Sequence, residues 1–553
     1  MDSVSSRIAA ARRDAGMTQR DLADRIGTTV WTIDELEGGR LDANRFVAAI
    51  ESATSKPGGW LLERGLRIVE SRPVDTHQDA VSRSLTTTER FDRNVVLGVF
   101  ATLVTVRFFT ETVGFLPSAG NFVDVLLLPI LLAIVAVRPT THSPLALERS
   151  PYVVPALIFA GLCVASIVVN ISRVAPVPAL LFVYGFLGPL VFYYATHRLW
   201  PTGQALALSQ TIVVLGVLQF VVIGLFDLPT FLESRNPDDI VGTFGGNAYQ
   251  LVFFLLVFAA LVAGIATLET SRRVARFAIP LFGATFLVIF LAQYRALLIF
   301  SALAVLLIGF MLSAARGRGF VVAATVVIAF IAALGYVSAK YPTFKFAPTI
   351  EAVREDPMSF VTARFDPGRD VISLYGDEPL FVVTGTGPGT YSSRAWRTFA
   401  EVGKASASEG AAQPYATALT GGRAYRTDVS DRYVIPRLET APIVLGSAAV
   451  TSPFSSYIAL LAEVGVLGLA LMLVIYLRAL FEAGRIAYAS IRSATSHDAL
   501  PALALATMVA FFLLLQTAFL ENWWEVARAT VPSWMMLAVC AKEFATRSGS
   551  REQ

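Results

Sequence analysis

A glycine-rich stretch is the first part of this sequence whose residue types could do chemistry. Residues 384–391 read TGTGPGTY, with Gly385, Gly387 and Gly389 at alternate positions. Glycines at this density let a backbone approach a neighbour closely, as phosphate-binding loops require. The spacing matches neither the GxGxxG of a dinucleotide-binding fold nor the GxxxxGK[ST] of a P-loop, so nucleotide binding is not indicated.

Arginines form the second chemical feature. Arg235, Arg295 and Arg364 stand near the ends of apolar segments, and Arg107 precedes Glu111 by four residues. A guanidinium group is always charged and can bind phosphate oxygens through two parallel hydrogen bonds. Several that converge at one surface would suit a phosphate or diphosphate. For Arg107 two interpretations stand, a structural ion pair with Glu111 or the lining of a substrate cavity.

The composition indicates that a membrane positions these residues. The chain has 553 residues, of which 55% are hydrophobic and 16% charged, and its mean hydropathy is +0.60. These values lie far from those of soluble globular proteins. A net charge of +3 is too small to indicate nucleic-acid binding. Cys163 and Cys540 both lie in apolar runs, which argues against a disulfide framework or a cysteine-rich zinc site, and we expect no metal and no cofactor.

Apolar stretches of about 20 residues, long enough to cross a bilayer, recur from residue 94 onward. We expect an all-α polytopic membrane protein with about twelve spans, a mostly helical extracytoplasmic loop at 339–455 and a cytoplasmic tail at 542–553. The expected spans are 94–114, 121–138, 151–171, 177–196, 205–226, 247–268, 275–293, 295–313, 319–338, 456–480, 500–519 and 527–541.

The orientation follows from the N-terminus and the positive charges. The first residues lack the apolar core of a signal peptide, so both termini are expected in the cytoplasm. Short cytoplasmic loops retain Lys and Arg. Fourteen such residues then lie inside: Arg138, Arg149, Arg198, Arg272, Arg273, Arg276, Arg316, Arg318, Arg478, Arg485, Arg492, Lys542, Arg547 and Arg551. Four lie outside, of which Arg173 and Arg528 are expected to be surface arginines or headgroup anchors. TGTGPGTY therefore faces outward, away from cytosolic nucleotides.

Residues 1–72 form a separate cytoplasmic unit, joined to the spans by a polar linker at 73–93. Within it, Thr18 is expected to cap one helix and Gly27 to make a turn. Thr28 is expected to cap a second helix with Val30, Ile33 and Leu36 facing inward. The segment MTQRDLADRIGTTVWTIDELEGGR resembles the Cro/repressor-like helix-turn-helix family.

The charges of this unit favour a protein partner over DNA. Residues 1–72 contain eleven basic and eleven acidic residues, whereas DNA-binding domains are usually basic. Thr28, Thr29 and Thr32 could reach a groove, but the acidic residues beside them would repel phosphates. We expect docking of a cytoplasmic protein, with DNA binding as the alternative.

Four blocks of the remaining chain resemble, in order and spacing, the O-antigen ligase and polymerase superfamily. They are IVGTFGGNAYQLVFFLLV, LAQYRALLIFSALAVLL, RFDPGRDVISLYGDEPLFVVTGTGPGTY and SSYIALLAEVGVLGLALML, within residues 94–541. The resemblance implies a polyprenol-dependent membrane glycosyltransferase. Such an enzyme moves a glycan from a polyprenyl diphosphate onto a glycan, lipid or protein acceptor during cell-surface polysaccharide assembly.

The resemblance also assigns roles. In the matching blocks Arg295, Arg235 and Arg364 would neutralise the leaving diphosphate. The expected substrate contacts are Gly385, Gly387, Gly389, Tyr391, Arg369, Arg107 and Tyr457. For the glycines a second interpretation remains open, a tight turn that positions the arginine-bearing loop.

The sequence departs from the family at one position. Family ligases often carry a His-Asn pair before the aromatic residue that opens the tenth span, and here the chain reads TSPFSSYIALLAE. All four histidines, at positions 77, 142, 197 and 497, are expected inside. This favours a polymerase or another polysaccharide transferase over a lipid A-core ligase. Carboxylates could serve as acid or base instead, and the candidates are Asp366, Asp370, Glu439 and Asp431, while Glu463 is expected to pair within the bundle.

Two other classes of function remain open at this point. The same arginines could bind a lipid-linked saccharide for transport across the membrane without chemistry. A membrane-tethered regulator could act through the helix-turn-helix unit. The sugar and the acceptor are not indicated by the sequence.

Overall fold

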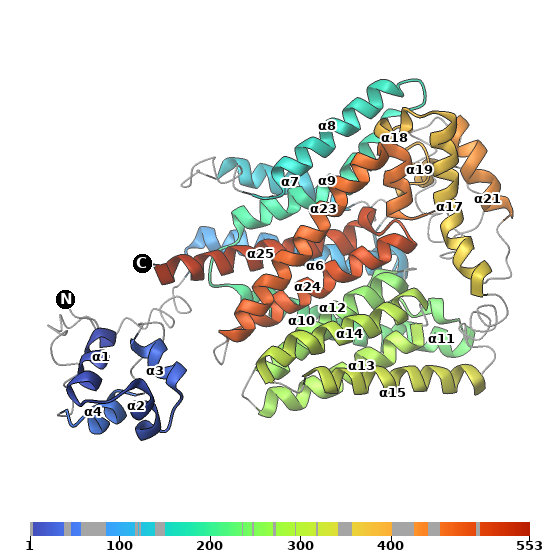
Figure 1. Ribbon diagram of the computed structural model, residues 1–553. Helices are drawn as coiled ribbons and strands as arrows, with labels where there is room; N and C mark the ends of the chain where they lie inside the picture. The colour runs from blue at the N-terminus through green and yellow to red at the C-terminus, as the bar shows by residue number, and fades with distance from the viewer. Residues whose placement is uncertain are drawn as a thin grey trace. The chain divides into compact units, whose positions relative to one another are not determined.

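The computed structural model describes residues 4–37, 46–56, 85–116, 120, 123–138, 150–234, 236–245, 248–268, 272–292, 295–316, 319–340, 357–400, 425–440, 454–493 and 498–552. All regular elements within these ranges are helices (Figure 1). The chain divides into two compact units, Met1–Arg83 and Ser84–Gln553.

The first unit is a small helical domain with its own core. Its helices are α1 (Val4–Asp14), α2 (Gln19–Ile26), α3 (Val30–Glu37) and α4 (Val47–Ala53). Thr18 caps α2 in a reciprocal capping box with Asp21, and Gly27 ends the helix with a φ of 69°, as the sequence predicts. The core is formed by Ile8, Leu22, Ala23, Ile33, Leu36, Val47 and Ile50.

Two details of α3 differ from the prediction. The hydroxyl of Thr29, rather than that of Thr28, accepts the amide of Thr32 at 3.2 Å at the start of the helix. Val30 is 41% exposed and so does not face inward, because Ile33 and Leu36 already cover the side of the helix that packs on α1 and α2.

The second unit contains a helix in each of the twelve predicted spans. They are α6 (Thr87–Arg107, continued by η2, Phe108–Thr112), α7 (Val123–Val137), α8 (Val153–Val169), α9 (Pro176–Leu199), α10 (Ala205–Val222, continued by η5, Ile223–Asp227, and α11, Leu228–Ser234), α12 (Ala248–Leu268), α13 (Arg272–Ala292), α14 (Arg295–Arg316), α15 (Gly319–Lys340), α23 (Ser456–Arg492), α24 (Leu500–Leu520) and α25 (Ala527–Glu552). Among the described residues, six helices are long and apolar enough to cross a membrane, judged by length and composition: Thr87–Thr112, Pro176–Leu199, Ala205–Ser234, Ala248–Thr267, Ser456–Arg492 and Leu500–Leu520. The unit is therefore an all-α bundle of the membrane-embedded class.

The first of these helices begins earlier than predicted. α6 starts at Thr87, where Thr86 and Glu89 form a capping box, so residues 87–93 are helical rather than part of a linker. Asp92 is buried in its first turns and forms an ion pair with Arg138 at 2.5 Å. The polar composition of this segment therefore reflects a helix end held by a cap and an ion pair. Residues 73–84 of the predicted linker lie outside the described residues.

A helical segment from the predicted outer loop, here called the outer segment (described residues 357–400 and 425–440), gathers at the end of the bundle opposite the C-terminus (Figure 1). Its elements are α17 (Pro357–Asp377), α18 (Phe381–Thr384), α19 (Arg394–Phe399), η8 (Ser430–Val434) and α21 (Ile435–Thr440). It has a core of its own around Tyr391 and Trp396, both fully buried. The described part of the predicted outer loop is thus largely helical, as expected.

Candidate functional site

Helix α23 is interrupted near its beginning. Gly465 has φ 78° and ψ −175°, a backbone conformation that residues with a side chain rarely adopt. A Cβ at this position would lie 2.7 Å from the carbonyl oxygens of Val382 and Val383. The interruption therefore lets α18 approach the backbone of α23 directly, and only glycine fits there.

The glycine-rich stretch occupies this interruption. Thr386 donates its amide to the carbonyl of Ala462 at 2.8 Å, and Gly387 donates to the carbonyl of Glu463 at 3.1 Å. A Cβ on Gly385 would come within 2.3 Å of the carbonyl carbon of Glu463. Non-helical backbone within a membrane helix is tolerated where the protein itself supplies the missing hydrogen bonds, and TGTGPGTY supplies them here.

The carboxylate of Glu463 lies inside the same loop. Its exposed fraction is 0%. It accepts four backbone amides, from Gly389 at 2.5 Å, Tyr391 at 3.0 Å, Ser392 at 3.0 Å and Ser393 at 2.9 Å. Successive amides that point inward form an anion-binding concavity, here called the amide nest, and an internal carboxylate fills it.

The occupied amide nest helps to distinguish the two interpretations of the glycines, contact with the substrate or a structural turn. The backbones of Gly385, Gly387 and Gly389 pack against α8, α9 and α23, and the Tyr391 side chain is fully buried in the outer core. These contacts support the structural interpretation of the loop, a tight turn that fixes the outer segment to the bundle. In this structure the amides of Gly389 and Tyr391 are occupied and do not face a ligand.

A second buried polar group lies at the end of α6. Arg107 is 5% exposed, and its Nε lies 3.3 Å from an Oε of Glu111, which confirms that the two residues share a helical face. Its Nε and Nη1 are enclosed and donate no hydrogen bond to any described residue. Buried guanidinium N–H groups without acceptors are costly, so this side chain calls for an explanation beyond the ion pair.

Two more arginines from distant segments lie in its surroundings. Arg394 begins α19, and Arg528 lies in the first turn of α25, which packs on α6. Each interacts electrostatically with Arg107. The sequence predicts a surface arginine or a headgroup anchor at Arg528, and the structure differs. Arg528 is half-buried with its Nε enclosed, because the turn between α24 and α25 packs back into the bundle.

Three carboxyl groups accompany the three guanidinium groups. They are Glu111, Asp124, which accepts a hydrogen bond from the hydroxyl of Tyr184 at 2.9 Å, and Glu525. The six charged residues Arg107, Glu111, Asp124, Arg394, Glu525 and Arg528 are called the charge cluster below. They come from helix ends at the same side of the bundle as the outer segment.

Glu525 is the member with spare acceptor capacity. It is 8% exposed, one carboxyl oxygen accepts the amide of Arg394, and the other accepts no hydrogen bond from any described residue. Burial, with the nearby Glu463, raises the pKa of Glu525 to about 8. At neutral pH this carboxyl group is therefore mostly protonated, so the three guanidinium groups exceed the ionised carboxylates of the cluster.

The arginines assigned by the resemblance are only partly placed. Arg295 begins α14 and Arg364 lies within α17, but their side chains lie outside the described residues, as does the whole of Arg235. Whether these three side chains lie close together therefore stays a prediction.

The predicted acid–base residues are engaged in ion pairs where the structure describes them. Asp370 is held by two nitrogens of Arg437, and Asp366 pairs with Arg369 at 3.2 Å. Glu439 lies in α21, with its side chain outside the described residues. Both described carboxylates are therefore engaged by an arginine in this structure, and their role as acid or base stays a prediction.

Two further predicted residues have structural partners. Tyr457 donates its hydroxyl to the carbonyl of Leu515 at 2.5 Å and packs edge-on against Trp524, so it joins α23 to α24. Asp431 lies 3.8 Å from Arg426, and about half of each side chain is exposed.

Arg394 and Glu525 are absent from the sequence-based candidates. One signal for Glu525 is visible afterwards, since the stretch ENWWEVAR places Glu525 three residues before Arg528 between two apolar helices. Charges in such surroundings indicate buried partners. Arg394 carries no such signal, because it does not lie next to a long apolar run.

No protein-family model matches the chain. The class defined by the fold is an all-α protein with apolar helices suited to a membrane, with a charge cluster at one end of the bundle.

Proposed function

We propose that the protein is a membrane glycosyltransferase that transfers or polymerises a polyprenyl-diphosphate-linked oligosaccharide at the outer face of the cytoplasmic membrane. The proposal includes about twelve spans, cytoplasmic termini and no metal or further cofactor. One observation carries it: the buried Arg107 has two N–H groups without an acceptor among the described residues.

A lipid-linked diphosphate supplies what this arginine lacks. Its oxygens accept N–H donors in pairs, and its charge complements the surplus of guanidinium groups in the charge cluster. Electrostatic stabilisation is strong in apolar, water-poor surroundings, and it grows as the leaving diphosphate gains charge in the transition state. Arg394 and Arg528 would share this role with Arg107.

The resemblance to the O-antigen ligase and polymerase superfamily supports the same donor. In the proposed topology Arg295, Arg235 and Arg364 also face outward, where nucleotide sugars are absent and a donor must arrive already activated. These arginines would bind the diphosphate together with the cluster. The acceptor would be a glycan, a lipid or a protein.

Glu525 is the proposed proton acceptor in place of a histidine. The acceptor hydroxyl oxygen forms a bond to the anomeric carbon, and the bond from that carbon to the diphosphate oxygen breaks. The diphosphate leaves with the electron pair, and the hydroxyl proton passes to Oε1 of Glu525 in that fraction of the protein in which this carboxyl group is ionised. The raised pKa of about 8 lies close enough to neutral pH for a base of this kind.

The test uses the full-length protein in lipid nanodiscs. Its substrate is the lipid-linked glycan that accumulates when the gene is deleted, and the measurement is release of polyprenyl diphosphate. Arg107→Ala should abolish release, as should Arg295→Ala. Arg432→Ala is the control, because Arg432 is an exposed outer arginine that pairs with Asp377 at 2.8 Å.

If the wild-type protein does not break the bond between the glycan and the diphosphate, the proposal of an enzyme is wrong. With the protein in proteoliposomes, movement of the intact lipid-linked glycan between leaflets would then assign the cluster to a transporter.

Deletion of residues 1–72 tests the alternative of a membrane-tethered regulator, since glycan assembly that survives the deletion makes this unit accessory. We propose a cytoplasmic protein as the partner of this unit, with DNA as the alternative. Trp31, which is 66% exposed on α3, offers an apolar contact for the protein partner.

A further inference from the structure

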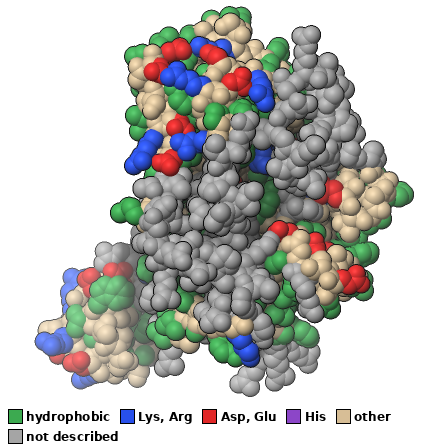
Figure 2. Space-filling view, turned by 90° about the vertical axis from the view of Figure 1, so that its right-hand side faces the viewer, with side chains coloured by type: hydrophobic (Ala, Val, Ile, Leu, Met, Phe, Trp, Pro, Cys, Tyr) green, Lys and Arg blue, Asp and Glu red, His purple; other side chains and the backbone are tan. Residues whose placement is uncertain are grey.

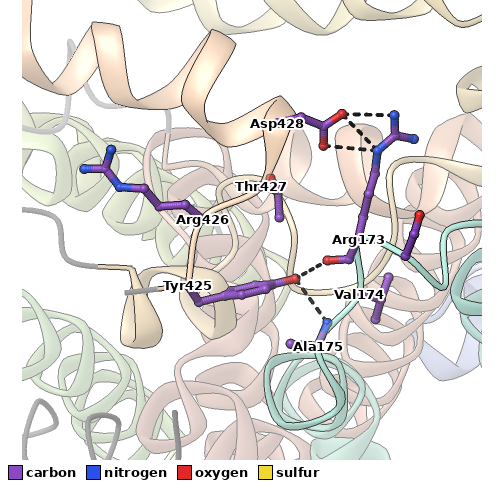
Figure 3. Close-up of a pocket in the computed structure, with 8 residues that line it drawn as sticks. Arg173, Val174, Ala175, Tyr425, Arg426, Thr427 and Asp428 are labelled. Carbon is purple, nitrogen blue, oxygen red and sulfur yellow. Dashed lines mark hydrogen bonds and ion pairs between the residues drawn. The ribbon is translucent and has the colours of Figure 1, made fainter. Parts of the chain in front are cut away.

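A pocket of about 310 Å³ lies where the α8–α9 turn meets the outer segment. One wall is residues 172–175, and the other is residues 425–428 (Figure 3). Both walls are outside the membrane in the proposed topology. The pocket is near the lower end of the volumes that hold small ligands, roughly 300 Å³, which suits about one or two sugar rings.

The walls are fixed by hydrogen bonds rather than by the ligand. The hydroxyl of Tyr425 donates to the carbonyl of Arg173 at 2.7 Å and accepts the amide of Ala175 at 3.2 Å, so its ring is held across the pocket (Figure 3). Thr427 donates its hydroxyl to the carbonyl of Thr390 at 2.8 Å, behind the wall. A pre-arranged pocket of this kind loses little entropy when it binds.

The charges of the pocket argue against a phosphate. Arg173 pairs with Asp428 at 3.0 Å and with Glu378 at 3.1 Å, and Arg426 lies 3.8 Å from Asp431. Around the pocket, two guanidinium groups thus pair with three carboxylates, whereas in the charge cluster the guanidinium groups exceed the ionised carboxylates. Figure 2 shows positive and negative side chains intermixed on the outer surface of the protein.

The same groups suit a neutral ligand rich in hydroxyl groups. Carboxylate oxygens accept hydroxyl protons, guanidinium groups donate to hydroxyl oxygens, and the face of a tyrosine ring packs against the C–H face of a sugar. Burial raises the pKa of Tyr425 to about 12, so its hydroxyl keeps its proton and its place in the wall. Arg426, with about half of its side chain exposed, can turn toward a ligand (Figure 3).

The pocket is also close to the charge cluster along the chain. Thr390 contacts the wall, and Arg394 donates its amide to Glu525 in the cluster. Four residues span at most about 14 Å, which a short oligosaccharide can bridge. We propose that this pocket is a saccharide-binding subsite, which holds a sugar of the glycan at a distance from its diphosphate. The inference rests on the proposed function for its substrate class.

The experiment measures binding without chemistry. The probe is the oligosaccharide released from the accumulating lipid-linked glycan by mild acid, freed of lipid and phosphate. Calorimetry with the full-length protein in nanodiscs gives its Kd. Tyr425→Ala and Arg426→Ala should each weaken binding about tenfold or more, which corresponds to the loss of one good contact. The exposed control Arg432→Ala should leave the Kd unchanged.

An unchanged Kd in both Tyr425→Ala and Arg426→Ala would overturn the subsite, as would the absence of binding in the wild type. Arg426→Ala alters an exposed side chain and so keeps the test valid if Tyr425→Ala fails to fold. In the transfer assay, a raised KM for the donor alone places the donor glycan in the pocket, and a raised KM for the acceptor alone places the acceptor there. Either result supports the subsite. If the wild type breaks no bond, the proposed function fails while the Kd measurement still decides the pocket.

Discussion

The amide nest and the charge cluster are two buried polar regions at the same end of the bundle, and they are built in opposite ways. In the nest, one carboxylate meets four backbone amides, and each of these amides has its acceptor. In the cluster, Arg107 keeps two enclosed N–H groups, and Glu525 keeps one enclosed oxygen, without hydrogen bonds among the described residues.

The difference separates a structural role from a binding role. Glycine-rich loops suggest ligand binding by their composition, yet this loop satisfies its own amides with a side chain from 72 residues further along the chain. The cluster has no recognisable motif, yet its Arg107 and Glu525 keep charged-group atoms without a hydrogen bond among the described residues. The proposed binding site therefore rests on unmet hydrogen bonds of buried charged groups rather than on residue type.

The largest expected effect comes from emptying the nest. Glu463→Ala leaves four buried amides without an acceptor, and each costs at least about 1 kcal/mol. We expect a loss on the order of 4 kcal/mol in the free energy of unfolding, seen as a large drop in thermal stability. Glu463→Gln, which keeps one acceptor oxygen, should lose less. Glu378→Ala, at an exposed ion pair, is the control, and an equal loss in that variant would refute the role of the nest.

Arg107→Ala should have the opposite effect, a large loss of activity without a loss of stability. Removal of one donor from a charge-stabilising site typically lowers turnover about 10²–10³-fold. Stability should hold or rise, because a buried, incompletely bonded charge is removed. Release of polyprenyl diphosphate and thermal unfolding of the same sample measure both quantities. A parallel loss of stability and activity would place Arg107 in the same structural class as Glu463.

Gly465→Ala tests the interruption of α23 that the nest requires. The positive φ costs roughly 1–3 kcal/mol for a residue with a side chain. The added Cβ would also press on the carbonyls of Val382 and Val383. Gly484→Ala in the same helix is the matched control, since its Cβ would lie 3.6 Å from Met508, an ordinary contact. Equal thermal stability of the two variants would contradict the close approach of α18.

The smallest expected effect is a pH dependence that belongs to the cluster alone. Glu525 has a pKa of about 8, so it is protonated below this pH and ionised above it. If it accepts the proton, turnover should rise about fivefold between pH 7 and pH 8, and about tenfold in all before it levels off near pH 9. Because the folded pKa is raised above the usual 4.5, the same group favours the folded state at low pH, and this stabilisation is lost as pH rises through about 8. Glu525→Gln should remove both trends, and a rise that persists in this variant would assign the base elsewhere.

Helices could be predicted from the sequence far better than contacts. Each predicted span contains a helix, because a long apolar run leaves few other ways to satisfy a buried backbone. The error at residues 87–93 has the opposite cause. Their polar composition suggests a linker, but a capping box and the Asp92–Arg138 pair stabilise a helix that extends beyond the apolar run.

The site could be predicted only where its partners are near in sequence. The Arg107–Glu111 pair is four residues apart and was found. Arg528 was misplaced and Arg394 missed, because each meets its partners through folding of segments more than 100 residues away. The glycines of TGTGPGTY were recognised as a loop, but the occupant of that loop, Glu463, could not be found without the interruption at Gly465.

The position of Glu463 also has a consequence for biogenesis. In the proposed topology, α23 enters the bilayer during synthesis with an acidic side chain that costs about 2–3 kcal/mol in lipid. Residues 389–393, which supply its four amides, precede it in the chain and have already crossed to the outer side by then. The four amide donors are thus already synthesised when α23 is inserted. The order of synthesis therefore shortens the time that this carboxylate spends in the membrane without hydrogen bonds.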